Sequence, residues 1–163
     1  MTSLTTAQAW KRAPVSMFFA TVAGVGHIPG APGTYGALVG LIPVWFAATM
    51  LPPWGRWTLF LATLGLSFFW AHRAGQAMGE PDASAIVIDE VVGVWVAFIV
   101  FSTFGWLALL VGFVAFRIFD ILKPPPIGLI DDRMKNGVGV VLDDVLAGIF
   151  AIPFVWVAMV WGG

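Results

Sequence analysis

The chain has 163 residues, of which 60% are hydrophobic and 10% charged, and its formal net charge is −1. A typical soluble domain carries roughly 45–50% apolar and about 25% charged residues, so this composition excludes a disordered chain and favours a bilayer as solvent. The charge balance lacks the basic excess of a nucleic-acid binder, and the absence of cysteine excludes disulfides, thiolate metal sites and cysteine nucleophiles.

The first half of the chain alternates short apolar stretches with helix breakers. Residues 1–23 start polar and become weakly apolar, which predicts an interfacial segment rather than a cleaved signal peptide. Residues 24–36 read GVGHIPGAPGTYG, and glycine and proline at this density predict a loop. Residues 37–51 and 57–71 predict two short helices joined by a tight turn, the second extending to about residue 78.

The second half is dominated by longer apolar stretches that begin after a polar turn at residues 79–84. A single helix over residues 86–122 would reach ~55 Å, too long for a ~30 Å hydrocarbon core, so we expect a helical hairpin broken at residues 102–105. Residues 123–136 predict an aqueous loop, and residues 137–161 the last span. The expected fold is all-α: one domain over residues 1–163, a polytopic membrane helical bundle of about five transmembrane or re-entrant helices plus the N-terminal segment.

The charged residues predict an orientation for this bundle. With five spans, every lysine and arginine except Arg56 falls on one side, which the positive-inside rule assigns to the cytoplasm. The N-terminus is then cytoplasmic and the C-terminus is outside. All nine acidic residues fall on the cytoplasmic side as well. Because acidic residues contribute little to topology, their one-sided distribution indicates a function at the inner face.

Three acidic clusters interrupt the apolar stretches. An ionisable group at membrane depth is costly and indicates function, and several carboxylates cannot stay ionised together without a cation. Carboxylate oxygens are hard ligands, so the expected ion is Mg²⁺ or Mn²⁺, and the shortage of histidine argues against zinc. The sequence therefore predicts one shared metal site, whose candidate ligands are Asp89, Glu90, Asp120, Asp143 and Asp144.

Basic residues accompany these acids in a pattern that suits a phosphate. Arg117, Asp120 and Lys123 follow one another at i, i+3 and i+6, which places them on one face of a helix. Arginine and lysine both bind phosphate, and the glycine-rich loop adds the backbone of Gly33 and the hydroxyl of Thr34. Taken singly, each acid–base pair can be a structural ion pair at a helix end. The acidic pair at residues 143–144 can likewise cap the last span, where the helix dipole favours negative charge. Together the three clusters predict phosphoryl chemistry, and the remaining acids are expected to be solvated loop charges: Glu80, Asp82 and Asp132.

Four sequence blocks, in order, carry a family resemblance. They are GVGHIPGAPGTYG at residues 24–36, AIVIDEVVG at 85–93, FRIFDILKPPPI at 116–127 followed by Asp131, and NGVGVVLDDVLAG at 136–148. The chain resembles the phosphatidylglycerophosphatase A family, Mg²⁺-dependent bacterial membrane phosphatases. The resemblance implies removal of the terminal phosphate of phosphatidylglycerophosphate, a lipid phosphomonoester, to give phosphatidylglycerol at the cytoplasmic face of the inner membrane.

The resemblance also implies roles, residue by residue. We expect a metal-activated water to be the attacking group, with an aspartate nucleophile as the open alternative, and Asp131 to be a general base or a supporting residue. The expected partners are the lipid substrate and the bilayer. The implied catalytic residues are Asp89, Asp120, Asp131 and Asp144; the metal ligands are Asp89, Glu90, Asp120, Asp143 and Asp144; and the phosphate-binding residues are Arg117, Lys123, Gly33 and Thr34.

Two other classes of membrane protein also use clustered acids. A CDP-alcohol phosphotransferase would open its motif with Asp-Gly-x-x-Ala-Arg, which this sequence lacks. A cation transporter would carry its acids near the membrane midplane, often on broken helices. Here the acids gather on one side among arginine and lysine, which favours the phosphatase. Ion flux into vesicles without phosphate release would favour the transporter.

Overall fold

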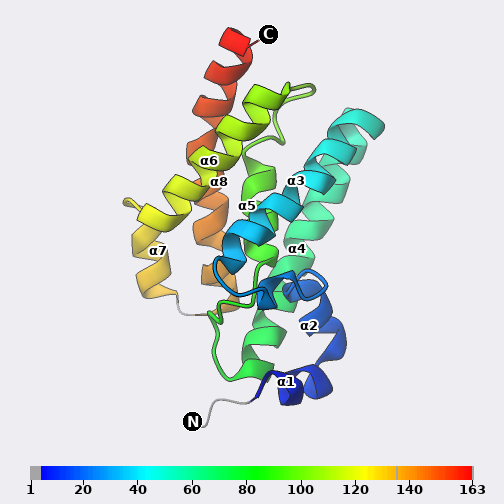
Figure 1. The fold of residues 1–163 in the computed structure, drawn as a ribbon, viewed down its shortest axis with the longest axis vertical. Helices are drawn as coiled ribbons and strands as arrows, with labels where there is room; N and C mark the ends of the chain where they lie inside the picture. The colour runs from blue at the N-terminus through cyan, green and yellow to red at the C-terminus, as the bar shows by residue number, and fades with distance from the viewer. Residues whose placement is uncertain (1–4, 135, 163) are drawn as a thin grey trace.

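The computed structural model describes residues 5–134 and 136–162, and every regular element within them is a helix (Figure 1). The expected all-α class is therefore confirmed for this part of the chain. The elements are α1 (Thr6–Arg12), α2 (Pro14–Ala20), the 3₁₀ turn η1 (Val25–His27), α3 (Pro32–Met50), α4 (Pro53–Met78), α5 (Ile88–Val96), α6 (Trp106–Leu122), α7 (Ile127–Arg133) and α8 (Gly137–Gly162).

The short helix α5 forms the centre of the bundle. It lies between α3, α4, α6 and α8 in Figure 1, and all of its residues are buried except the half-buried Glu90. A helix that is apolar around its whole circumference must be covered on every side, which explains its place in the core. Its acidic first turn is therefore held inside the protein by the packing of the rest of the helix.

Two expected loops are partly helical. Residues 24–36 were expected to form a loop, but α3 already begins at Pro32. Proline suits the first turn of a helix because its fixed φ is helical and its missing N–H would have no partner there. Residues 123–136 were expected to be an aqueous loop, but they include α7, whose first residue, Ile127, is fully buried in the core. Burial of Ile127 anchors the segment against the bundle.

The predicted hairpins are confirmed with shifted ends. The helices α3 and α4 meet at Leu51 and Pro52, as expected, and α4 continues to Met78, where Gly79 with φ of 77° ends it. The second hairpin breaks earlier than predicted, because α5 ends at Val96 and irregular chain then leads to the start of α6 at Trp106.

The N-terminal segment folds into two short helices against α4. Trp10 Nε1 donates a hydrogen bond to His27 Nε2 at 3.1 Å, which ties α1 to the turn after α2. Phe19 of α2 stacks on Trp70 of α4 with ring centroids 4.1 Å apart. The segment thus packs on the same end of the bundle as the C-terminal end of α4 (Figure 1). Its interfacial position stays a prediction.

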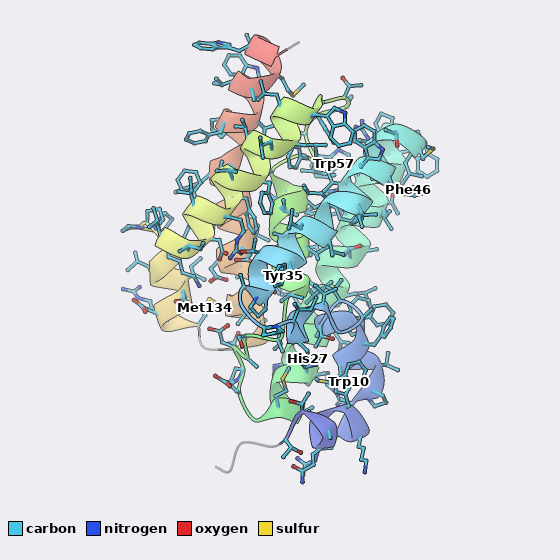
Figure 2. All side chains as sticks on the ribbon, in the orientation of Figure 1. Trp10, His27, Tyr35, Phe46, Trp57 and Met134 are labelled. Atoms are coloured by element: carbon cyan, nitrogen blue, oxygen red, sulfur yellow. The ribbon has the colours of Figure 1, made fainter. Side chains whose placement is uncertain are left out.

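Two helices of the described chain, α3 and α8, are long and apolar enough to cross a membrane, so a five-span topology is not confirmed. In the most apolar 18-residue stretch of each helix, only 28% is buried inside the fold. Large apolar side chains project outward from the bundle, among them Phe46 and Trp57 (Figure 2). An apolar exterior of this kind favours membrane association.

The ends of the bundle differ in polarity. Side chains that carry oxygen gather mostly in the lower half of Figure 2, whereas carbon dominates the upper half. The basic residue at the upper end is Arg56, which is buried and donates hydrogen bonds to the Phe101 carbonyl at 2.9 Å and to Ser102 Oγ at 3.2 Å. The predicted separation of Arg56 from the other charged residues therefore exists in the fold.

Candidate active site

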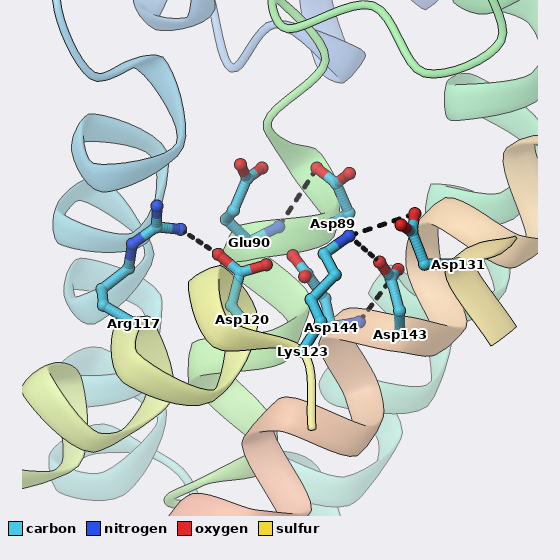
Figure 3. A network of polar contacts seen from close by, with 8 residues as sticks. All are labelled: Asp89, Glu90, Arg117, Asp120, Lys123, Asp131, Asp143 and Asp144. Atoms are coloured by element: carbon cyan, nitrogen blue, oxygen red, sulfur yellow. Dashed lines mark hydrogen bonds and ion pairs between the residues drawn. The ribbon is translucent and has the colours of Figure 1, made fainter. Parts of the chain in front are cut away.

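Four helices bring their ionisable residues to one place in the lower half of the bundle (Figure 3). Asp89 and Glu90 lie in the first turn of α5, where the helix dipole favours negative charge. Asp144 comes from the second turn of α8, and Arg117 and Asp120 from the end of α6. These segments are far apart in the sequence, so the cluster is a product of the fold.

Three carboxylates form the inner part of the cluster, which we call the acidic triad: Asp89, Glu90 and Asp144. One oxygen of each lies within 4.8 Å of the other two. Asp89 and Asp144 are buried, with 6% and 3% of their surface exposed, and Glu90 is half-buried. Three carboxylates at this spacing repel one another strongly in a medium of low dielectric constant.

Glycine allows the two acidic helices to approach. A Cβ on Gly148 of α8 would collide with the backbone carbonyl of Gly93 in α5, and a Cβ on Gly93 would lie 2.8 Å from the carbonyl oxygen of Asp144. The α5 and α8 backbones therefore touch where both lack side chains. This contact holds Asp144 beside the first turn of α5.

Two cations neutralise the outer carboxylates. Arg117 Nη1 lies 2.5 Å from Asp120 Oδ2, and Lys123 Nζ lies 2.5 Å from Asp143 Oδ2 and 3.1 Å from Asp131 Oδ1. Asp120 and Asp143 line the same cavity as the triad, but each is engaged by a basic side chain. The five predicted metal ligands therefore divide into a triad and two ion-paired carboxylates.

Lys123 does not share a helix face with Arg117 and Asp120, contrary to the prediction. The helix α6 ends at Leu122, and Lys123 takes the left-handed conformation with φ of 43°. This conformation is uncommon for a residue with a side chain, and proline follows it, so α6 cannot continue. The turn redirects the ammonium group from α6 toward Asp131 and Asp143.

The electrostatic environment of Lys123 favours its charged form. Partial burial alone would lower its pKa, but the hydrogen bonds and charges of Asp143 and Asp131 outweigh burial and raise the pKa above its ordinary value. Lys123 is therefore a fixed positive charge at neutral pH. It can donate to an anion but cannot serve as a general base there.

Two buried oxygens of the triad, Glu90 Oε2 and Asp144 Oδ2, have no hydrogen-bond partner within residues 5–134 and 136–162. Burying a charged oxygen without a partner costs several kcal/mol, which a cation at this position would offset. Hard carboxylate oxygens are the donors that Mg²⁺ and Mn²⁺ prefer, and both ions complete their shells with water or phosphate oxygens. The triad therefore fits a divalent cation.

A cavity of about 230 Å³ opens beside the triad. Gly33 lies on its wall, and a Cβ there would collide with a Glu90 oxygen and lie 3.1 Å from Arg117 Nη1. A side chain at position 33 would therefore displace the carboxylate of Glu90 from its place in the triad. Thr34, also predicted to contact phosphate, is not among the residues that line the cavity.

Two polar residues that line the cavity were not predicted as part of the site. Asp82 was expected to be a solvated loop charge, and it is exposed, but together with Ser84 it lines the cavity. Both precede Asp89 on the connection from α4 to α5. No spacing in the sequence marks them, because the turn that carries them back over the cavity is irregular.

Comparison with known proteins supports one family. The family model described as Phosphatidylglycerophosphatase A matches residues 18–159. The chain is 37% identical over 130 residues to phosphatidylglycerophosphatase A of Escherichia coli K12, covering 78% of this chain and 74% of the relative. The same enzyme of Haemophilus influenzae is 37% identical over 142 residues, covering 85% of each chain.

A further relative carries another name. A protein of Bacteroides thetaiotaomicron, named as a candidate phosphatidylinositol-3-phosphatase, is 37% identical over 142 residues, covering 83% of this chain and 87% of the relative. No solved structure matches the chain significantly. All three relatives are named for the removal of phosphate from a phospholipid.

Proposed function

Because the chain belongs to the phosphatidylglycerophosphatase A family and is a phosphatase, we propose that it hydrolyses the terminal phosphomonoester of phosphatidylglycerophosphate to phosphatidylglycerol and inorganic phosphate. The observation that carries the proposal is the acidic triad, whose oxygens lie within 4.8 Å of one another beside Arg117 and Lys123. Carboxylates that hold a cation, next to donors for phosphate, are the groups that phosphoryl transfer needs.

The triad would hold a divalent cation, and Mg²⁺ is the proposed cofactor. When bound, such an ion neutralises phosphate oxygens and lowers the pKa of a water molecule. Asp89 and Asp144 are the buried members of the triad, and Glu90 faces the cavity from its half-buried position. Asp120 and Asp143 contribute negative charge from the same cavity but remain paired with basic side chains.

The basic residues would bind and orient the phosphate. Arg117 gives one Nη to Asp120, while its buried Nε has no partner among the described residues. A guanidinium has five N–H donors, so Arg117 can stay paired and still bind a phosphate oxygen. Lys123 has three donors, of which Asp143 and Asp131 take two. Both cations would stabilise charge on the phosphoryl group during transfer.

Asp131 is proposed to support the reaction through Lys123. Its carboxylate lies 3.1 Å from Lys123 Nζ, and this ion pair restrains the ammonium group beside the cavity. Asp131 does not itself line the cavity. A role as general base would require α7, which carries Asp131, to move toward the cavity.

We also propose that the protein spans the bacterial inner membrane several times, with the site facing the cytoplasm. The helices α3 and α8 are candidate spans, and α4 and α6 expose large apolar side chains along their lengths. The central α5 is too short to span, but the irregular chain after it reaches the upper end of the bundle (Figure 1). Irregular backbone is tolerated at membrane depth where protein covers it.

The experiment is phosphate release by the purified protein from phosphatidylglycerophosphate in detergent micelles, with Mg²⁺ and with EDTA. We expect release only with the metal, and a loss of at least about 100-fold in Asp89→Asn and Asp144→Asn. Asp132→Asn, at an exposed acid of α7, is the matched control and should retain the rate. Near-normal rates in both triad variants would refute the site.

The substrate head group needs its own comparison, because one relative is named for a phosphoinositide. Phosphatidylglycerophosphate and phosphatidylinositol 3-phosphate with identical acyl chains should be assayed side by side. We expect the higher kcat/KM with phosphatidylglycerophosphate. A preference for the phosphoinositide would overturn the proposed substrate while leaving the phosphatase assignment intact. A cation transporter, the alternative from sequence, receives no support from the relatives.

A further inference from the structure

An apolar groove with a volume of about 470 Å³ runs between α3 and α6. Every residue that lines it is apolar, and several of these side chains are exposed, including Ile42 at 67% and Trp106 at 76%. The groove therefore offers nothing to a polar ligand. It is open on one side, so an apolar occupant could enter it laterally.

The groove is bounded at one end by two tryptophans. Trp45 of α3 and Trp106 of α6 stack with ring centroids 5.1 Å apart and planes 13° apart. They are the lining residues farthest along their helices from the acidic cavity. The stacked rings join the two helices there and limit how far an extended occupant can reach.

The other end of the groove leads to the acidic cavity along the same two helices. On α6, Phe113 lines the groove, and Arg117, four residues later on the same face, lines the cavity. On α3, Leu38 lines the groove, and Gly33 lines the cavity. One helical turn, ~5.4 Å, thus separates apolar lining from charged lining on α6.

We propose that this groove holds an acyl chain of the lipid whose phosphate is hydrolysed in the acidic cavity, a proposal that rests on the proposed function. Along α3 and α6 the lining changes from apolar in the groove to charged in the acidic cavity. A phospholipid changes in the same order, from its apolar tail to its charged phosphate. The phosphate would lie by Arg117 and the tail would run toward Trp106. Burial of the tail would then position the phosphate at the triad.

A second apolar pocket on α6 serves as the comparison. It is lined by Val111, Val114 and Phe154, among others, and lies between α6 and α8. Val114 and Arg117 are three residues apart, but Val114 falls on the opposite side of Arg117 from the groove residue Phe113 on the helix circumference. The pocket shares Leu110 with the groove, but Val114 does not line the groove, and at 43% exposure it is open to substitution, as Ile42 at 67% is.

The test uses two phosphatidylglycerophosphates that share a head group and differ in their tails, dipalmitoyl and dihexanoyl, in micelles of fixed composition. Ile42→Trp fills the groove from an exposed position. We expect its kcat/KM to fall about tenfold or more on the long-chain substrate, chiefly through KM, and to be unchanged on the short-chain one. Val114→Trp should leave both values unchanged.

A second variant tests whether Ile42→Trp acts by filling the groove or by disturbing the packing of the helices. Trp106→Ala removes an exposed ring and opens the far end of the groove. It should therefore lower the ratio of kcat/KM on the dipalmitoyl substrate to kcat/KM on the dihexanoyl substrate. The groove assignment is overturned if Ile42→Trp lowers both substrates equally, if Val114→Trp matches it, or if Trp106→Ala leaves this ratio unchanged. If the unaltered protein releases phosphate from neither lipid, the proposed function falls, and the groove assignment with it.

Discussion

Lys123 Nζ lies 2.5 Å from Asp143 Oδ2, so the residue that follows α6 is tied to the acidic turn of α8. Asp143 is buried, and the lysine side chain is 30% exposed. The same ammonium reaches Asp131 on α7. One side chain thus joins three helices at the edge of the site, and its loss should affect both stability and activity.

We expect Lys123→Met to lower the free energy of unfolding by about 1–3 kcal/mol, because it leaves the buried Asp143 carboxylate without a charged partner. Phosphate release should fall as well, since a donor to phosphate is gone. Lys123→Arg should restore most of the stability. Unfolding in detergent, followed by circular dichroism, measures the first effect. A Lys11→Met control at an exposed lysine should change nothing, and equal stability of the two methionine variants would contradict the role of the ion pair.

Glu90→Gln should separate stability from activity. Removing one negative charge from the acidic triad relieves repulsion, so in EDTA the variant should unfold at a higher temperature than the unaltered protein. In Mg²⁺ its rate of phosphate release should fall at least about 100-fold. Thermal unfolding in EDTA and phosphate assays in Mg²⁺ are the two measurements. A variant that is less stable in EDTA would show that Glu90 serves structure rather than the cation.

Gly148→Ala should impair the protein although it changes no reactive group. The new Cβ would collide with the carbonyl of Gly93 and push α8 from α5, at a cost of about 1–3 kcal/mol. Because this shift moves Asp144 away from Asp89, activity should fall together with stability.

The matched control for that substitution is Gly65→Ala in α4. A Cβ at Gly65 would meet nothing within 4 Å, so alanine should raise stability by up to ~1 kcal/mol through its better helix propensity. Chemical unfolding and phosphate release of both variants check the pair. If Gly148→Ala behaves like Gly65→Ala, the close approach of α5 and α8 does not matter to the site.

The proposed orientation can be tested with single cysteines, since the chain contains none. Thr103 lies in the connection before α6 at one end of the bundle, and Asp132 lies on α7 toward the other, both exposed. On intact cells, a membrane-impermeant maleimide should label Thr103→Cys and spare Asp132→Cys until the cells are permeabilised. The reverse pattern would place the site outside.

The composition and the apolar pattern were sufficient to predict the helical class and both hairpins, because long apolar stretches between breakers leave few alternatives. The acidic clusters at Asp89, Asp120 and Asp144 were recognisable because charge in an apolar stretch is costly. Their meeting in one cavity followed from the expectation that all of them lie on the same side of the membrane.

Other features depend on contacts that no pattern in the sequence records. The short helix α7 depends on the burial of Ile127, whereas the helical start at Pro32 follows from the preference of proline for a first helical turn, a local signal masked by the density of breakers in residues 24–36. The left-handed conformation of Lys123 ends α6, so Lys123 does not lie on the helix face predicted for it with Arg117 and Asp120. The division of the acids into a triad and ion-paired carboxylates depends on side-chain reach, and the groove depends on the gap between α3 and α6.

The central claim is that Asp89, Glu90 and Asp144 together bind a divalent cation. Electron paramagnetic resonance of Mn²⁺ titrated into the purified protein measures this binding without any substrate. We predict bound Mn²⁺ that excess Mg²⁺ displaces, lost in Asp144→Asn and retained in Asp132→Asn. Equal Mn²⁺ binding by the unaltered protein and Asp144→Asn, or no binding by either, would contradict the claim.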